Sequence, residues 1–431
     1  MNNELLQQVR LIDPVSGTDQ LADVLIADGV IQAVQERISD YPSDTHLRDC
    51  RGLVLGPGLV DLYSHSGEPG FEERETLASL ACAATSGGFT RLNILPDTVP
   101  PVDNLAGLAR LQSLLLTRVT TPYLPKSIKI HYWAALTLGV QGQQMTELAE
   151  LAAASGVVGF ADGQPIGSLA LVRRLLEYLK PLGKPVALWP CDQHLAGNGV
   201  MREGPFSVRF GLPAVPAIAE TSALAALLEL VEAVGTPVHI MRVSTARSVQ
   251  LIQSAKARGL PITASTSWMY LVLDTQAVGS YSTSLRLEPP LGNAADLVAL
   301  RQGVQQGVVD AIAIDHTPYT YEEKTVAFAE APPGAIGLEL ALPLLWQNLV
   351  ETGEWSALEL WRVLSTRPAE CLQQIPAAIA SGKPAEMTLF APQISWTVES
   401  QTLKSLSNNT PWLGEQLSGR VLQTWDSGLS T

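Results

Sequence analysis

Residues 58–73 read GLVDLYSHSGEPGFEE, and the interpretation of the whole chain starts from this stretch. An apolar run ends in Asp61, Tyr63 and His65, and a turn at Glu68–Gly70 then breaks it. Side chains two residues apart on a strand point to the same face. The three polar side chains are therefore expected to point the same way at the end of a strand, where they indicate a site rather than a core. A metal site, however, would need more than one histidine here.

Strand-like and helix-like segments alternate after Pro57. Amphipathic segments such as 221–235 and 248–259, both ending in glycine, separate short apolar runs. The eight runs are LVDLY, TRLNIL, IKIHYWAAL, VVGFAD, KPVALWP, TPVHIMRV, LPITAST and VDAIAID. This alternation is typical of an α/β fold, and eight strands favour a (β/α)8 TIM barrel. A doubly wound sheet stays open as the alternative, because a strand count does not separate the two.

Segments with β character flank the barrel at both ends of the chain. Short strand-like runs separated by turn residues fill the first fifty residues, and AEMTLFAP, ISWTV and GRVLQTW follow Pro384. We therefore predict a small composite β-sandwich made of residues 1–56 plus 376–431. The barrel is expected to span residues 57–375.

The composition excludes several kinds of partner. The 431 residues carry a net charge of −14, and 46% of them are hydrophobic. Nucleic acid and anionic membranes both require a basic surface, so neither is expected as a partner. The four cysteines lie far apart, and neither a signal peptide nor a membrane-spanning apolar run is recognisable. A reducing cytoplasm is the expected location.

Polar residues recur where the predicted strands end, which is where the chemistry of a TIM barrel is located. The candidates are Asp61, Tyr63, His65, Asn93, Asp97, Asp162, Pro190, Cys191, Asp192, His239, Arg242, Asp315 and His316. Each also has an ordinary structural explanation: an aspartate before a loop often caps a helix, and His239 can be a hydrogen-bonded core residue. Of the six histidines, only His65 and, less clearly, His316 occupy such a position, which is few for a catalytic metal.

A series of motifs along nearly the whole chain carries a family resemblance. In order they are LIDPVSGTDQLADVLIADG, GPGLVDLYSHSGEPGFEERETLASLACAATSGGFT, LPDTVPPVDN, VVGFADGQPI, LAGNGVMREG, HIMRVSTARSVQLI, ITASTSWMYLVL, LEPPLG, IAIDHTPYTYEEK and APPGAIGLELALPLL. In order and spacing the chain resembles dihydroorotase of the amidohydrolase superfamily, in the branch that includes allantoinases and hydantoinases. The resemblance implies a barrel with a composite β-sandwich, a site with one or two zinc ions, and a homodimer. The implied reaction is the reversible closure of N-carbamoyl-aspartate to dihydroorotate.

The resemblance also shows which expected metal ligands have changed. The six positions are Tyr63, His65, Asp162, Pro190, Arg242 and Asp315. Tyr63, Pro190 and Arg242 stand where the family has histidines; the other three positions are retained, and Asp315 is the family's general base. Proline has no side-chain donor atom, and arginine keeps its proton in proteins, so neither can ligate zinc.

Arg242 is the natural substitute for the missing cation. Buried carboxylates without a counter-charge are costly, so Asp162 and Asp315 need a positive partner if no metal is bound. We expect Arg242 to occupy the metal's place and to pair with Asp162, Asp315 or both. On this interpretation the chain needs no cofactor; zinc is the cofactor if the site still works.

The positions that hold the substrate in the family have changed as well. Gly67 and Gly292 replace arginines, Asp97 and Glu288 replace asparagines, and Tyr319 replaces a later histidine. The two acidic replacements would repel an anionic substrate. Loss of metal ligands and loss of anion binding together indicate lost dihydroorotase activity.

Three functions remain open on these observations. The first is a catalytically inactive dihydroorotase-like protein of pyrimidine biosynthesis that is a structural or regulatory partner of aspartate transcarbamoylase, as the resemblance to inactive dihydroorotase-like chains implies. The second is an active dihydroorotase or related cyclic amidohydrolase, with a single metal at His65, Asp162 and Asp315, or with no metal and Asp315 as general base. The third is a binding module for a cationic or neutral ligand, which Asp97 and Glu288 would allow.

Overall fold

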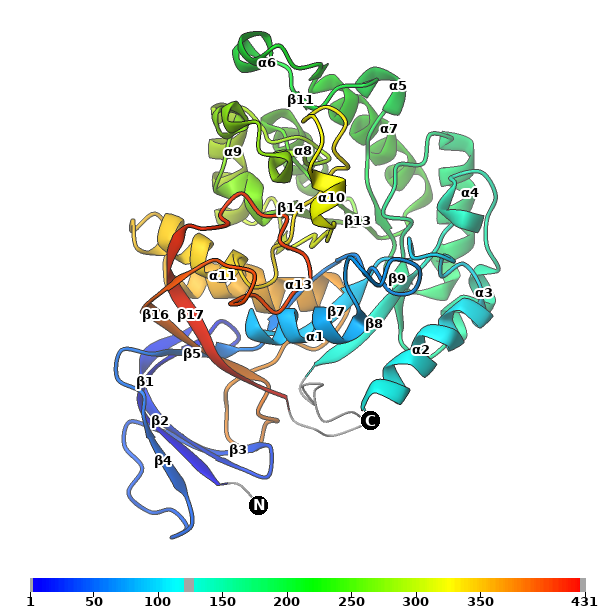
Figure 1. Cartoon of the computed structure of the whole chain (residues 1–431). Coiled ribbons are helices and arrows are strands. Elements are labelled where there is room, and N and C mark those ends of the chain that lie inside the picture. The colour runs from blue at the N-terminus through cyan, green and yellow to red at the C-terminus, as the bar shows by residue number, and fades with distance from the viewer. Residues whose placement is uncertain (1–2, 120–127, 427–431) are drawn as a thin grey trace.

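The computed structural model describes residues 3–119 and 128–426, and its centre is a barrel of parallel strands (Figure 1). The strands form two hydrogen-bonded arcs, in the orders β6-β7-β8-β9 and β10-β13-β14-β15. Their bounds are Leu59–Val60 (β6), Phe89–Ile94 (β7), Lys129–Ala134 (β8), Val157–Phe160 (β9), Ala187–Leu188 (β10), Val238–Ile240 (β13), Ile262–Ser267 (β14) and Ala311–Ala313 (β15). All eight apolar runs predicted as strands contribute to this wall.

Backbone contacts at two seams close the ring. A parallel bridge between Phe160 and Val186 joins the two arcs. At the other seam the amide of Asp315 donates to the carbonyl oxygen of Tyr63 (3.1 Å), and the amide of His65 donates to that of His316 (2.8 Å). An open doubly wound sheet has no such second seam. The predicted (β/α)8 barrel is therefore confirmed.

Helices follow the strands and cover the outside of the barrel (Figure 1). The longer ones are Leu77–Ser86 (α1), Leu105–Val119 (α2), Leu148–Ala153 (α3), Leu169–Leu179 (α4), Ile218–Val234 (α7), Ala246–Ala257 (α8) and Ala294–Gln305 (α9). Their ends follow local rules: α1 begins at a capping box between Thr76 and Ser79, and α7 ends at Gly235, whose φ of 75° is the left-handed conformation that glycine adopts readily.

Shorter elements fill the connections and the base. They are Leu138–Val140 (η1), Lys180–Leu182 (η2), Gln193–Ala196 (α5), Met201–Arg202 (β11), Pro205–Phe210 (α6), Ala214–Val215 (β12), Trp268–Leu271 (η3), Thr275–Ser280 (η4), Thr283–Leu285 (η5), Tyr321–Lys324 (α10), Ala341–Leu345 (α11), Trp346–Val350 (η6), Ala357–Trp361 (α12), Arg362–Thr366 (η7) and Arg367–Cys371 (α13). None of the helices in the described part of the chain has the length and apolar character needed to cross a membrane. None of the four cysteines, all within the described residues, forms a disulfide bond.

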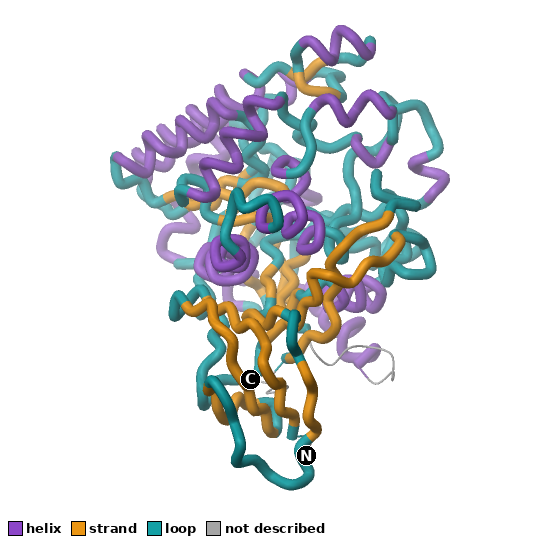
Figure 2. The backbone as a smooth tube through the Cα atoms, turned by 90° about the vertical axis from the view of Figure 1, so that its left-hand side faces the viewer, coloured by secondary structure: helices purple, strands orange, loops and turns teal. Residues whose placement is uncertain are grey.

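The β domain is one hydrogen-bonded sheet to which both ends of the chain contribute (Figure 2). Its strands are Glu4–Asp13 (β1), Thr18–Ala27 (β2), Val30–Gln35 (β3), His46–Asp49 (β4), Val54–Pro57 (β5), Met387–Thr397 (β16) and Gln416–Trp425 (β17). They are ordered β17-β16-β5-β1-β2-β3, with β4 also paired to β1. The antiparallel pairing of β16 with β5 sets Met387 opposite Pro57 and Phe390 opposite Val54. A β domain built from both termini, as predicted, is confirmed.

A buried charge cluster joins the β domain to the barrel. Nε of Arg91, on β7, donates to Glu386 (2.6 Å), which directly precedes β16, and Nζ of Lys129, on β8, donates to the same carboxylate (3.0 Å). Burial alone would raise the pKa of Glu386, but the bonds and charges of Arg91 and Lys129 outweigh burial and lower it to about 2.

Residues 398–415, between β16 and β17, form what we call the C-terminal strap, which reaches the loops that follow β15. The side-chain amide of Asn409 accepts a hydrogen bond from the amide of Tyr319 (3.2 Å) and donates to the carbonyl oxygens of Thr317 (2.8 Å) and Gly334 (3.2 Å). The indole of Trp412 stacks on that of Trp268, with ring centroids 5.2 Å apart. The last part of the chain thereby fixes the rim of the barrel.

Candidate functional site

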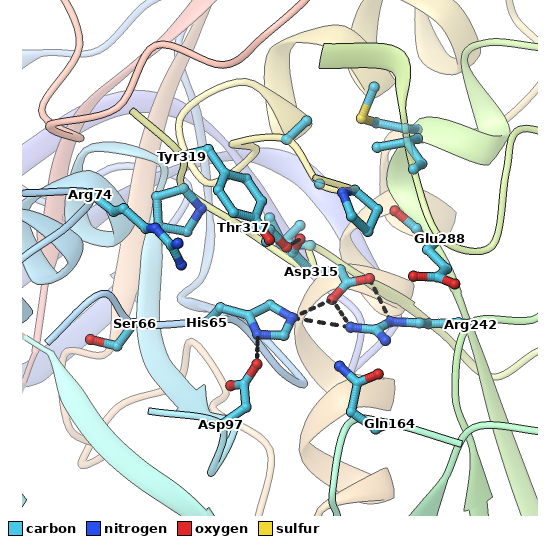
Figure 3. Close-up of a pocket in the computed structure, with 18 of the residues that line it drawn as sticks. His65, Ser66, Arg74, Asp97, Gln164, Arg242, Glu288, Asp315, Thr317 and Tyr319 are labelled. Atoms are coloured by element: carbon cyan, nitrogen blue, oxygen red, sulfur yellow. Dashed lines mark hydrogen bonds and ion pairs between the residues drawn. The ribbon is translucent and has the colours of Figure 1, made fainter. Parts of the chain in front are cut away.

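A cavity of about 130 Å³ opens at the carboxyl ends of the barrel strands. Seven of the residues predicted from strand ends and family positions line it together: His65, Gly67, Asp97, Arg242, Glu288, Asp315 and Tyr319. Figure 3 shows His65 between Asp97 on one side and the Arg242–Asp315 pair on the other.

The guanidinium of Arg242 grips Asp315 with two bonds. Nε lies 2.8 Å from Oδ2, and Nη2 lies 2.7 Å from Oδ1. The two side chains are only 5% and 12% exposed, so this is a largely desolvated, bidentate pair. Burial raises the pKa of the Asp315 carboxyl, but the charge of Arg242 outweighs burial and holds it well below its usual range. Of the two carboxylates expected for Arg242, the structure places Asp315 against it.

The remaining bonds of Arg242 complete its surroundings. Nη1 donates to the carbonyl oxygen of Gly163 (2.9 Å), and Nη2 lies 3.1 Å from Nε2 of His65. The guanidinium carbon also lies 4.7 Å from the centre of the Trp189 ring, within cation–π range. Pro190, the next residue, has no donor atom to offer the cavity.

Tyr63 holds both partners of this pair by the backbone. Arg242 and Asp315 have φ values of 55° and 53°, in a left-handed region that costs a non-glycine residue roughly 1–2 kcal/mol. The amide of Arg242 donates to the Tyr63 hydroxyl (3.2 Å), and the amide of Asp315 donates to the Tyr63 carbonyl oxygen. Tyr63, which the family resemblance places at a histidine position, therefore stabilises the backbone on which the ion pair is built.

The Tyr63 hydroxyl also begins a buried polar chain. It lies 3.0 Å from Oγ of Ser265, which lies 2.8 Å from Nε2 of His239, whose Nδ1 lies 2.9 Å from Oγ1 of Thr263. Burial lowers the pKa of His239 to about 3, so this imidazole is neutral. His239 is thus a hydrogen-bonded core histidine.

The three polar residues that end the first apolar run were expected to share one face, but in the structure they do not. The regular ladder is interrupted after Val60 and resumes at a parallel bridge between Ser64 and Ile94. Within this irregular stretch the Asp61 carboxylate accepts bonds from Oγ of Ser64 (2.6 Å) and the amide of Ile314 (3.1 Å). Of Asp61, Tyr63 and His65, only His65 lines the cavity.

His65 sits between carboxylates. Its Nδ1 lies 2.6 Å from Oδ2 of Asp97, and its Nε2 lies 3.6 Å from Oδ1 of Asp315. Burial disfavours a charged imidazole, but Asp97 and Asp315 outweigh burial and raise the pKa of His65 to about 9. Asp97, which was expected to repel an anionic substrate, is engaged with this imidazole.

Asp162 is hydrogen-bonded to the loop after β8. Its Oδ1 accepts bonds from the amides of Leu136 (2.8 Å) and Thr137 (3.0 Å), and its Oδ2 accepts from the Thr137 hydroxyl (2.5 Å). The side chain is buried, and burial raises its pKa. Three donors from Leu136 and Thr137 hold this carboxylate, so it anchors the loop after β8.

Packing closes Gly67 and Gly292, the two positions where the family resemblance implies arginines. A Cβ atom on Gly67 would lie 2.3 Å from the carbonyl oxygen of Phe71 and 2.5 Å from that of Glu75. On Gly292 it would lie 2.6 Å from Cβ of Asp296. No side chain fits at either position in this backbone, so single substitutions cannot restore the substrate-holding arginines.

Arg74, which sequence reasoning missed, is the cation at the outer side of the cavity. Its guanidinium lies 3.8 Å from the Phe71 ring and 4.8 Å from the Tyr319 ring, and its Nε donates to Glu323 (3.0 Å). Arg74 lies in a turn, where no helix or strand periodicity indicates which way a side chain points, and the neighbouring glutamates make it look like part of an ordinary charged surface. Glu323 neutralises it, so it is not a free anion site.

His316 serves the rim and not the cavity. Its Nε2 lies 3.4 Å from Oε2 of Glu75, a carboxylate that also accepts bonds from the hydroxyl of Ser405 and the amide of Leu406 on the strap. Its Nδ1 accepts from the amide of Gly337 (3.2 Å). His316, the residue next to Asp315, is therefore connected to the strap through Glu75.

The donor atoms at the site do not fit a zinc ion. Across residues 3–119 and 128–426, no group of three or more His, Cys, Asp or Glu side chains is arranged to hold a metal. The guanidinium of Arg242 stands beside His65 and against Asp315, and a dication there would meet a fixed positive charge. Asp162 has its oxygens occupied by Thr137 and Leu136.

Comparison with known proteins agrees with the fold and the motifs. The profile of the dihydro-orotase-like family matches residues 52–248. A probable dihydroorotase-like protein of Synechocystis sp. is 44% identical over 99% of this chain and 100% of its own length. The dihydroorotase of Pelobacter propionicus is 37% identical over 99% of this chain and 98% of its own. L-Hydantoinase (dihydropyrimidinase) from Arthrobacter aurescens has the same fold, with a TM-score of 0.85 over 100% of this chain and 96% of its own, at 21% identity. The chain belongs to the dihydroorotase-like family.

Proposed function

We propose that this chain is a non-catalytic dihydroorotase-like protein of pyrimidine biosynthesis that acts as a structural or regulatory partner of aspartate transcarbamoylase. The observation that carries the proposal is the bidentate pairing of Arg242 with Asp315. It gives the family's general base a permanent partner and puts a guanidinium where the family needs a metal ligand.

The side chains at the site are not suited to catalysing ring hydrolysis. A general base works best when its pKa lies near the operating pH, and Arg242 holds that of Asp315 far below neutrality. Nε, Nη1 and Nη2 of Arg242 donate to Asp315 and Gly163, which leaves few N–H groups for a developing oxyanion. The closed positions at Gly67 and Gly292 remove the arginines that would hold the substrate.

The intact scaffold supports a role in assembly. The barrel is closed, Arg242 and Asp315 adopt left-handed conformations, and His65 pairs with Asp97 as Arg242 pairs with Asp315. A chain that keeps its fold while its site residues pair with one another is suited to binding a partner protein through its surface. The homodimer suggested by the family resemblance is part of this proposal.

Two measurements test the proposal. In the first, hydrolysis of dihydroorotate is followed with the purified chain, its Asp315→Ala variant and the P. propionicus dihydroorotase as positive control. We expect no difference between the chain and the variant. Hydrolysis that is above background and lost in Asp315→Ala would identify an active cyclic amidohydrolase instead.

In the second, the chain is sedimented alone and mixed with the aspartate transcarbamoylase encoded in the same genome. We expect a dimer alone and a larger complex in the mixture. Independent sedimentation of the two proteins at concentrations well above those typical of stable assemblies would refute the partnership.

A further inference from the structure

A second recess of about 1030 Å³ lies beside the cavity, between the C-terminal strap and α10. One wall comes from strap residues 400–413, and the other from residues 319–325 with residues 282–284. We call it the strap groove. Tyr319 lines both the groove and the cavity, so a molecule in the groove would lie next to the mouth of the barrel.

Large apolar side chains line the strap groove while remaining exposed. Tyr321 is 79% exposed on α10, and Leu406 and Leu413 are 53% and 48% exposed on the strap. Isolated exposed apolar residues are common, but several gathered in one recess typically mark an interaction site.

The walls of the groove are held in place. Asn409 ties the strap to the loop after β15 through its bonds to Thr317, Tyr319 and Gly334. On the opposite wall the Thr283 hydroxyl donates to the carbonyl oxygen of Lys324 (2.7 Å). A preformed recess loses little conformational entropy when it is filled, which favours binding.

The charge of the groove selects its occupant. Glu73 and Glu322 line it and are exposed, and within the described chain neither carboxylate has an ion-pair or hydrogen-bond partner. The cations nearby are already engaged: Arg74 pairs with Glu323, and Nζ of buried Lys324 donates to backbone carbonyl oxygens. A second copy of a chain of net charge −14 would bring like charge to this surface.

We propose that the strap groove docks a segment of a partner protein that carries basic side chains beside apolar ones. The apolar side chains fill the space between Tyr321, Leu406 and Leu413, and the basic ones meet Glu73 and Glu322. The inference rests on the proposed function only in naming transcarbamoylase as the source of the segment.

The groove is tested first with short labelled peptides, read by fluorescence anisotropy. We expect an alternating lysine–leucine peptide to bind at least about tenfold more tightly than lysine–serine or glutamate–leucine peptides. The affinity should fall by about the same factor in Tyr321→Ser/Leu413→Ser and in Glu73→Lys/Glu322→Lys. Val208→Ser, on exposed α6, and Glu150→Lys/Glu351→Lys, a charge reversal at exposed sites, serve as matched controls.

If the lysine–leucine peptide does not bind, or if the control variants weaken its binding as much as the groove variants do, the strap groove is not a docking site. The same variants are then sedimented with transcarbamoylase. If the groove variants bind transcarbamoylase about tenfold more weakly than the wild-type chain, the result supports docking in the groove. If they bind it equally well, the docking proposal is refuted and the proposed function still stands. If the peptide binds but no complex with transcarbamoylase forms, transcarbamoylase is refuted as the partner and the groove remains a docking site. Self-association abolished by the groove variants would identify a second copy as the occupant and overturn the inference.

Discussion

Replacing Arg242 by methionine tests whether the guanidinium is the counter-charge that Asp315 requires. Methionine keeps much of the length but removes two charge-assisted bonds of 2.7 and 2.8 Å. Removing one partner of a buried pair typically costs about 3–5 kcal/mol, because the other charge is left uncompensated. We expect a loss of that size in the free energy of unfolding at neutral pH. The loss should shrink in acid, because protonation of Asp315 removes the stranded charge.

A double-mutant cycle separates the ion pair from simple packing. Asp315→Asn alone leaves Arg242 without its anion and should also destabilise the chain. The double variant should lose less than the sum of the single losses, with a coupling energy of about 2–3 kcal/mol. Urea unfolding followed by tryptophan fluorescence and circular dichroism provides the free energies.

The matched control is a pair on the surface. Arg173 and Glu177 form an exposed i, i+4 pair on α4, so Arg173→Met should cost no more than about 0.5 kcal/mol. If Arg242→Met costs within about 1 kcal/mol of the control, or if the double variant is additive, Arg242 is not a needed counter-charge.

Three further outcomes are expected. After zinc loading and dialysis the wild-type chain should hold well below about one zinc, by metal analysis, and Arg242→His alone should not change this because Pro190 still lacks a donor atom. Glu386 has a pKa of about 2, below its ordinary 4.5, so its contribution of about 3 kcal/mol is complete above pH 4.5 and disappears as the pH falls toward 2; unfolding across this range should show that dependence, and Glu386→Gln should lack it. Asn409→Ala removes three hydrogen bonds and should cost about 2–4 kcal/mol, with faster proteolysis within the strap; an unchanged unfolding temperature and digestion pattern would contradict this.

The sequence was informative where periodicity and covalent chemistry decide the outcome. Eight apolar runs identified the barrel wall, and β segments at both ends identified the shared sheet. Arg242 and Pro190 could be excluded as zinc ligands from their functional groups alone. What the runs did not reveal was where regular pairing is interrupted: the first run looked like a strand through Tyr63, but its ladder breaks off after Val60 and resumes only at Ser64.

Side-chain partners that depend on non-local geometry could not be predicted. Asp162 and Asp315 were equivalent candidates for Arg242, and Thr137, a neighbour only in space, removed Asp162 from the choice. The bonds of Asn409 to the barrel rim join segments far apart in the chain, and no pattern in the strap announced them. Nor could composition show that the backbone closes over Gly67.

The pairing of β16 with β5 has a consequence for synthesis. Residues 58–386 separate the two strands, so at about 5–20 residues per second the ribosome needs roughly 16 to 66 s to deliver the partner of β5. Throughout that time the emerging chain presents a bare strand edge, the kind of surface that recruits other chains. A message truncated before Met387 would leave the edge bare permanently. The last forty-odd residues therefore protect the first fifty from aggregation, and chaperone demand should be greatest while the barrel is still being made.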